Sequence, residues 1–110
     1  MSYQTFSKSD IFFDINLDVE AVTVTDMVVE VALADKSHYL MKYSKQVKEG
    51  YTQSGLLEID GDTFRFRIPT EDTTSAPVGI YFISVYYLSV VDGTVQKVEN
   101  GITPLCELIS

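Results

Sequence analysis

Residues 57–69 read LEIDGDTFRFRIP and carry the clearest indication of the fold. Apolar and polar residues alternate on both sides of Asp60-Gly61, a dipeptide that favours the tight turn of a β-hairpin. After the turn, three apolar residues share one face of a strand and three polar residues share the other: Phe64, Phe66 and Ile68 against Thr63, Arg65 and Arg67. Pro69 cannot donate a ladder hydrogen bond and ends the strand. The stretch therefore predicts a hairpin with one buried face.

Working outward toward the N-terminus, the same period of two recurs in residues 10–19. One face takes the apolar residues Ile11, Phe13, Ile15, Leu17 and Val19, and the other takes Phe12, Asp14, Asn16 and Asp18. Such alternation is typical of a strand that is buried on one side. Residues 27–33 and 38–47 predict two further strands. A short helix over 35–47 is the alternative for the second of these.

Toward the C-terminus, residues 70–75 are polar and predict a long loop. The longest predicted strand, 80–91, has apolar residues on both faces, so it lies at the centre of its sheet or meets another chain. Asp92-Gly93 predicts a second hairpin, into a strand over 94–98. Asn100-Gly101 predicts a further turn, and 102–109 a last strand in which Pro104 indicates an edge or a bulge.

Seven to eight short strands at roughly ten-residue spacing predict an all-β fold, a sandwich or a small barrel, and the alternating pattern favours an immunoglobulin-like antiparallel β-sandwich. The 110 residues suit one domain over 1–110, with residues 1–9 as an N-terminal arm.

Charge and composition narrow the possible partners. The chain has 16 Asp and Glu against 8 Lys and Arg, a formal net charge of −8. Nucleic-acid binding needs clustered basic residues, so this balance argues against nucleic acid, and it also disfavours an anionic membrane surface. The opening Met1-Ser2-Tyr3-Gln4 leads straight into polar sequence, so we expect no secretory signal and no membrane span.

The residues offer little for catalysis. His38 and Cys106 are the only residues of their types, too few for a zinc site, and Cys106 can form no internal disulfide. A Cys106–His38 pair is a weak alternative to a small, buried Cys106. Asp60-Gly61-Asp62 resembles part of a calcium loop but lacks its remaining acids, and a hairpin turn explains it. We expect no enzyme activity, no metal and no cofactor.

Aromatic residues are abundant, with seven Tyr and six Phe. Tyr is enriched at protein interfaces because its ring is large and its hydroxyl is polar. The candidate interface residues are Tyr81, Phe82, Tyr86, Tyr87, Tyr39 and Tyr43. The alternative is that these rings, together with Tyr51, cap the edges of the core.

A series of segments resembles one known family. The series comprises Lys8 to Ile15, Gly61 to Asp72, Pro77-Val78-Gly79-Ile80-Tyr81, Asp92-Gly93-Thr94-Val95 and Asn100-Gly101-Ile102. Together they resemble the immunoglobulin-like N-terminal domain of phage upper-baseplate proteins and related phage tail and virion domains. The resemblance covers residues 7–109. The family's usual link after the first strand is replaced here by Val22 to Asp26, and the Pro77–Gly79 turn is one residue longer.

This resemblance implies a non-enzymatic structural protein of a phage particle, in the tail, the baseplate or another component. It implies partners among copies of the chain itself and other virion proteins, and synthesis in the bacterial cytoplasm before incorporation into the virion. A carbohydrate- or receptor-binding module is the alternative, in which exposed Tyr rings stack on a host-surface glycan.

Overall fold

Strand β6 (Thr63–Ile68) forms as the alternation predicts. Its side chains at Phe64, Phe66 and Ile68 are fully buried, while those between them are half-buried. It pairs antiparallel with β5 (Leu56–Asp60) through a two-residue loop, in which Gly61 takes a φ of 62°. That left-handed conformation suits Gly because it has no Cβ.

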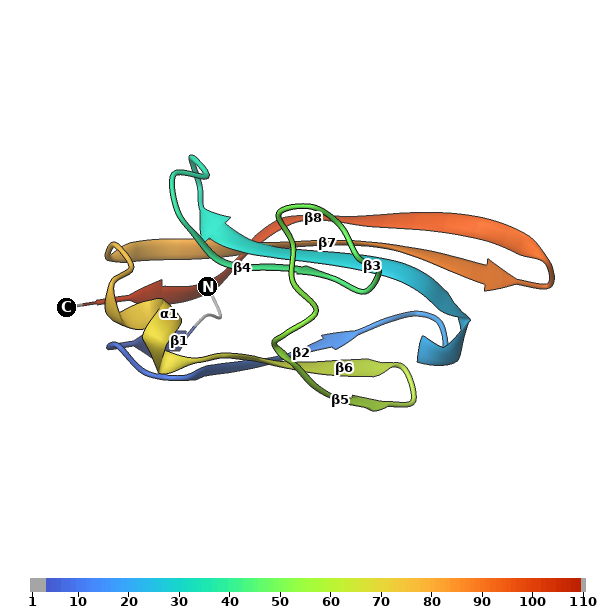
Figure 1. Ribbon diagram of the computed structural model, residues 1–110, viewed down its shortest axis with the longest axis horizontal. Helices are drawn as coiled ribbons and strands as arrows, with labels where there is room; N and C mark the ends of the chain where they lie inside the picture. Colours follow the sequence, from blue (N-terminus) through green and yellow to red (C-terminus); the bar gives the residue numbers. More distant parts are fainter. Residues whose placement is uncertain (1–3, 110) are drawn as a thin grey trace.

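The computed structural model describes residues 4–109 and contains two β-sheets packed face to face (Figure 1). The other strands are β1 (Gln4–Phe6), β2 (Ile11–Asn16), β3 (Val24–Leu33), β4 (Tyr39–Ser44), β7 (Gly79–Val91) and β8 (Thr94–Leu108). A 3-10 turn, η1 (Ala21–Thr23), precedes β3, and a short helix, α1 (Thr70–Thr74), links β6 to β7.

The large sheet has the strand order β1-β8-β7-β3-β4, and the small sheet has the order β2-β6-β5. In immunoglobulin terms, β3, β7 and β8 take the places of strands C, F and G, and β2, β6 and β5 those of B, E and D. The predicted all-β, immunoglobulin-like sandwich is therefore confirmed, with eight strands. One pair departs from the antiparallel prediction, because β1 runs parallel to β8. Residues 4–6 of the predicted N-terminal arm thus belong to the sheet. Residues 1–3 of that arm, and Ser110 of the predicted domain, lie outside the described residues.

The core lies between the sheets and is centred on aromatic contacts. Phe66 stacks on Phe13 with ring centroids 5.4 Å apart, and meets Tyr43 edge-on at 5.0 Å. Burying one such ring contributes roughly 1.5–3 kcal/mol, and the contact of Phe66 with Tyr43 of β4 adds to the attraction between the two sheets.

Strand β7 confirms the prediction of a central strand with two apolar faces. It pairs with β3 on one side and β8 on the other. Tyr81, Val85 and Tyr87 point into the core, whereas Phe82, Ser84 and Tyr86 point away from the small sheet. The Tyr81 hydroxyl donates a 2.8 Å hydrogen bond to the carbonyl of Pro77. This bond, at the start of the strand in the F position, is the tyrosine corner of immunoglobulin-like folds.

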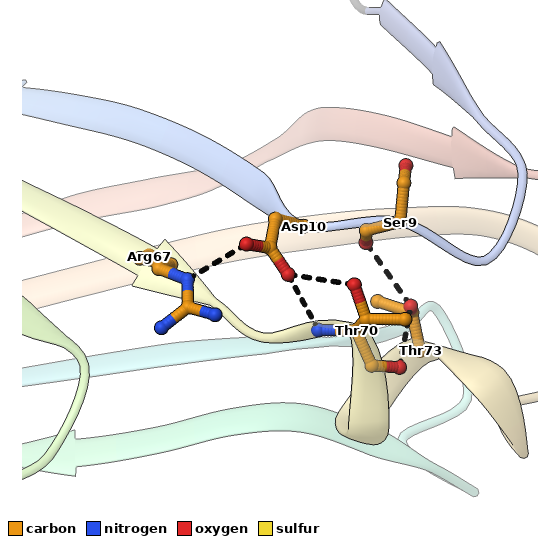
Figure 2. A network of polar contacts seen from close by, with 5 residues as sticks. All are labelled: Ser9, Asp10, Arg67, Thr70 and Thr73. Atoms are coloured by element: carbon orange, nitrogen blue, oxygen red, sulfur yellow. Dashed lines mark hydrogen bonds and ion pairs between the residues drawn. The ribbon is translucent and has the colours of Figure 1, made fainter.

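The predicted loop over 70–75 is wrong, because residues 70–74 form α1. Pro69 caps this helix without a side-chain bond of its own, and Asp10 supplies the missing acceptor (Figure 2). Its Oδ1 accepts hydrogen bonds of 2.7 Å from both the backbone N–H and the hydroxyl of Thr70. Its Oδ2 lies 2.9 Å from Nε of Arg67. A single turn is too short to show helical periodicity, and the group that stabilises it lies sixty residues away.

Two predicted details of the large sheet are also corrected. Asn100-Gly101 is not a turn, because β8 continues through it and the register with β7 shifts between Ile83 and Val85. Gly101 therefore lies in a β-bulge. In β4, Tyr39 pairs with Ala32 while Met41 pairs with the adjacent Val31. Tyr39 and Met41 consequently point to opposite faces, although simple alternation places them on the same one.

Residues 38–47, where a short helix was the alternative, contain the strand β4. Pro104 lies beside a second register shift in β8, which confirms the predicted bulge. No helix within residues 4–109 is long and apolar enough to cross a membrane.

Candidate functional site

The middle of the outer face of the large sheet is built by alternate residues of β3, β4 and β7. Three rows cross it: Val28 with Tyr86, Glu30 with Lys42 and Ser84, and Ala32 with Tyr39 and Phe82. Since successive residues of a strand point to opposite sides, all of these side chains point away from the small sheet.

Lysines and tyrosines alternate across this face. Nζ of Lys42 lies 4.9 Å from the ring centroid of Tyr39 and 4.7 Å from that of Tyr51. Nζ of Lys48 lies 5.5 Å from the Tyr51 ring and 5.6 Å from the ring of Tyr86. Each ammonium is within the distance at which it is attracted to the negative face of a ring.

Lys97 extends the series onto β8, with its Nζ 5.2 Å from the Tyr86 centroid. We call this arrangement the tyrosine–lysine face; it consists of Tyr39, Lys42, Lys48, Tyr51, Tyr86 and Lys97.

Glu30 anchors the middle of the tyrosine–lysine face. The hydroxyl of Tyr51 donates a short hydrogen bond of 2.5 Å to its Oε2, and Nζ of Lys36 lies 3.7 Å from its Oε1. The hydrogen bond to Glu30, followed by burial and the charge of Glu30, raises the pKa of Tyr51 to about 12. Tyr51 therefore stays a neutral donor at physiological pH, and it holds its ring beside Lys42 and Lys48.

The loop between β4 and β5 folds back to bring Lys48 and Tyr51 onto the face. Thr52 makes two backbone hydrogen bonds of 2.9 Å to β4, donating to the carbonyl of Lys42 and accepting from the N–H of Ser44. At the start of the loop, the Gln46 side chain donates to the carbonyl of Thr25, and its N–H donates to Asp26. The loop is thus fixed at both ends.

The structure divides the six candidate interface residues into two groups. Tyr81, Tyr87 and Tyr43 have at most 2% of their surface exposed and lie in the core. For these three the prediction is wrong, because the alternation of β4 and β7 directs them inward. Phe82, Tyr86 and Tyr39 are half-buried and lie together on the outer face, where an interface role stays a prediction.

Sequence reasoning missed the lysines altogether and left Tyr51 out of the candidate set. Lys42 had a usable signal, because it is polar in a strand whose neighbours on both sides are buried. Lys48 and Tyr51 had none, since only the folded loop brings them beside Tyr86. The tyrosine corner also had a signal, in the spacing from Pro77 to Tyr81.

The outer face of the small sheet is different in kind. Arg65 lies 3.1 Å from Glu58, 3.6 Å from Asp14 and 3.8 Å from Asp60, each measured from a guanidinium nitrogen to a carboxylate oxygen. All four side chains are at least 40% exposed, and together they leave an excess of negative charge. This surface is hydrated and is held by ion pairs that water and salt screen.

The residues considered for catalysis are not arranged for it. Cys106 is fully buried, and this burial raises the pKa of its thiol to about 11, so it remains protonated. The ring of His38 packs edge-on against Tyr81, with centroids 6.4 Å apart. Within residues 4–109, no group of three or more His, Cys, Asp or Glu side chains is placed to hold a metal ion.

An open groove of about 680 Å³ lies between the edge of β4 and the edge formed by β5, β6 and α1. Its walls combine Tyr39 and Leu57 with the charged residues Lys42, Arg67 and Glu71. Arg67 is held by Asp10, so this basic group is already paired. The groove is mixed in character, and His38, Glu71 and Asp72 are among its lining residues.

No family model matches this chain, and no curated protein matches it either.

Proposed function

We propose that this chain is a non-enzymatic structural protein of a phage particle, a tail, baseplate or other virion component. Its function is to bind other virion proteins and copies of itself. The observation that carries the proposal is the tyrosine–lysine face, a set of stacked aromatic and basic side chains on the outside of the large sheet.

The chemistry of this face suits a protein partner. Interface centres are enriched in Tyr, whose rings bury a large area at low entropic cost while the hydroxyl finds a polar partner. The lysine side chains lie over the rings, and the ammonium groups of Lys42 and Lys48 can meet a partner carboxylate, whereas that of Lys97 already lies 2.9 Å from Glu99. The protein as a whole carries −8, so Lys42 and Lys48 together on one face favour an acidic partner surface.

The assignment to a phage particle rests on the resemblance of the strand and turn segments to virion domains. The folded chain is compatible with it, because Asp60-Gly61 and Asp92-Gly93 both form hairpins in an eight-stranded sandwich.

The proposal is tested by its genetic context and by the particle itself. The reading frames beside the coding sequence should encode tail or capsid proteins. Mass spectrometry of purified particles should find the chain in a fixed ratio to the other virion proteins. A chain that is expressed during infection but absent from washed particles would contradict the proposal.

Carbohydrate binding is the second candidate, and the groove of about 680 Å³ beside Tyr39 favours it. Aromatic rings next to hydroxyl and charged groups suit the apolar and polar faces of a sugar. Binding on a glycan array that is lost in Tyr39→Ala, with the fold intact, would support this candidate over the first.

A further inference from the structure

Strand β8 leaves most of one edge without a partner. On one side it pairs with β7 along its length, but β1 covers its other side only from Cys106 to Leu108. From Thr94 to Pro104, no strand within residues 4–109 lies on that side, and every residue except Val98 is exposed. Figure 1 shows the β7–β8 hairpin extending beyond the small sheet. An uncovered edge of this length presents N–H and C=O groups to any strand that matches it.

The hairpin turn determines which of these backbone groups point outward. Asp92 and Gly93 have φ values of 52° and 76°, and Val91 pairs with Thr94 across them. The residues that flank such a turn are hydrogen-bonded to each other, and bonded pairs then alternate along the ladder. Gln96 and Val98 therefore bond to β7. The N–H and C=O groups of Val95, Lys97 and Glu99 point to the open edge.

The side chains complement one another when the edge meets a second copy of itself. In an antiparallel pair with its two-fold axis at Val98, Lys97 of each copy stands opposite Glu99 of the other. In this register Lys97 and Glu99, whose backbone N–H and C=O groups point to the open edge, face each other across the two copies. Hydrogen bonds of an antiparallel ladder can therefore form between them. An axis at Lys97 or at Glu99 places like charges opposite each other, which destabilises a strand pair.

Two further features fit the same register. Lys97 and Glu99 already lie on one face of β8, with Nζ and Oε1 2.9 Å apart, so both are directed toward the same side of a joined sheet. Val95, 64% exposed, falls opposite Gly101 of the second copy. No atom lies within 4 Å of where a Cβ on Gly101 would be, so the valine has room there.

We propose that two copies of this chain pair their β8 edges antiparallel about Val98, so that two five-stranded sheets join into one of ten strands. The contact is symmetric and self-complementary, as a two-fold dimer requires. It goes beyond the proposed function, because it predicts a dimer in solution whether or not the chain belongs to a virion.

The proposal is tested by exchanging the charges of residues 97 and 99, which lie where the two β8 edges meet (the seam). Glu99→Lys is expected to weaken the dimer, and the double variant Lys97→Glu/Glu99→Lys is expected to restore it, because the opposed pairs are again of opposite sign. Sedimentation equilibrium of the full chain should give a dimer constant roughly tenfold weaker for the single variant, since two pairs change sign at once. A monomer at all soluble concentrations, or a double variant no tighter than the single one, overturns the proposal.

Amide exchange locates the seam independently of side chains. In the dimer, the amides of Val95, Lys97 and Glu99 should be protected, and in Glu99→Lys at low concentration they should exchange freely. Gln96 and Val98 bond to β7 and should be protected in both. A dimer in which the three outward amides exchange as fast as in the monomer would place the contact elsewhere and overturn the proposal. Because these readouts are made on the isolated protein, their failure leaves particle incorporation to test the proposed function separately.

Discussion

The two outer faces of this sandwich share one core but present different chemistry. On the small sheet, Arg65 is surrounded by three carboxylates, and all of these groups are well exposed. On the large sheet, lysines lie over tyrosine rings, and the anchoring Glu30 side chain is only 17% exposed. The small-sheet face is therefore the one adapted to water. A face of hydrated ion pairs gains little from being covered, whereas rings and lysine stems release water when a partner covers them.

The largest expected effect is on the core that both faces share. Phe66→Ala should lower the free energy of unfolding by about 3–5 kcal/mol, because it removes the ring that packs on Phe13 and Tyr43. Phe12→Ala is the matched control, since Phe12 is 59% exposed on the small-sheet face and should change stability by less than about 0.5 kcal/mol. Urea denaturation measures both. Equal losses would mean that the assignment of inner and outer faces is wrong.

The next prediction compares the stability lost when each of two tyrosine hydroxyl groups is removed. Tyr81→Phe removes the part-buried bond from the fully buried Tyr81 ring to the carbonyl of Pro77, and we expect a loss of about 1–1.5 kcal/mol. Tyr51→Phe removes the bond to Glu30 on the outer face, where water can replace it, and should cost about 1 kcal/mol or less. Thermal unfolding of the two variants ranks them. If Tyr51→Phe lowers the stability more than Tyr81→Phe does, the hydrogen bond on the outer face contributes more to stability than the one at the tyrosine corner, contrary to this prediction.

Groups on the two sides of the sandwich should lose their contributions to folding stability at opposite ends of the pH scale. The hydrogen bonds from Thr70 and Arg67 lower the pKa of Asp10 from 3.8 to about 2, so its contribution is present above pH 4 and is lost as the pH falls toward 2. The pKa of Tyr51 is raised from 10.0 to about 12, so its contribution is present below pH 10 and is lost as the pH rises toward 12.

The free energy of unfolding is measured as a function of pH. One variant tests the decrease at acid pH (the acid limb), and another tests the decrease at alkaline pH (the alkaline limb). Asp10→Asn should flatten the acid limb and leave the alkaline limb unchanged, and Tyr51→Phe should do the reverse. An acid limb that keeps its slope in Asp10→Asn would show that other carboxylates determine it.

The smallest expected effect concerns the charged groups themselves. Lys42→Ala removes contacts with two rings and should cost about 0.5–1 kcal/mol. Arg65→Ala removes exposed ion pairs, and we expect a change near the error of the assay that vanishes in high salt. Denaturation at low and high salt distinguishes them. A larger loss for Arg65→Ala in high salt would reverse the contrast between the faces.

Much of the fold could be predicted from local pattern. The burial of Phe64, Phe66 and Ile68 follows from the alternation on one side of a single hairpin turn. The central position of β7 follows because both of its faces are apolar. In such places the nearest neighbours in sequence already determine which side faces the core.

The sequence-based predictions fail where residues distant in the chain determine the local structure. The helix α1 depends on Asp10, and the outward position of Tyr39 depends on a register shift against Val31 and Ala32. The candidate site was found only in part for the same reason. Tyr86, Phe82 and Tyr39 were identified from composition, but the lysines over the rings depend on how the loop after β4 folds back.

We expect the tyrosine–lysine face, and not simply the charge of the protein, to carry the proposed contacts with a phage particle. The direct measurement is incorporation of Lys42→Glu/Lys48→Glu into particles in competition with the unaltered chain. Lys8→Glu/Lys45→Glu is the matched control, because both of its lysines are exposed, lie off the face and change the net charge equally. We predict that the first double variant folds but is excluded from purified particles, while the control enters normally. Equal incorporation of the two would contradict the account.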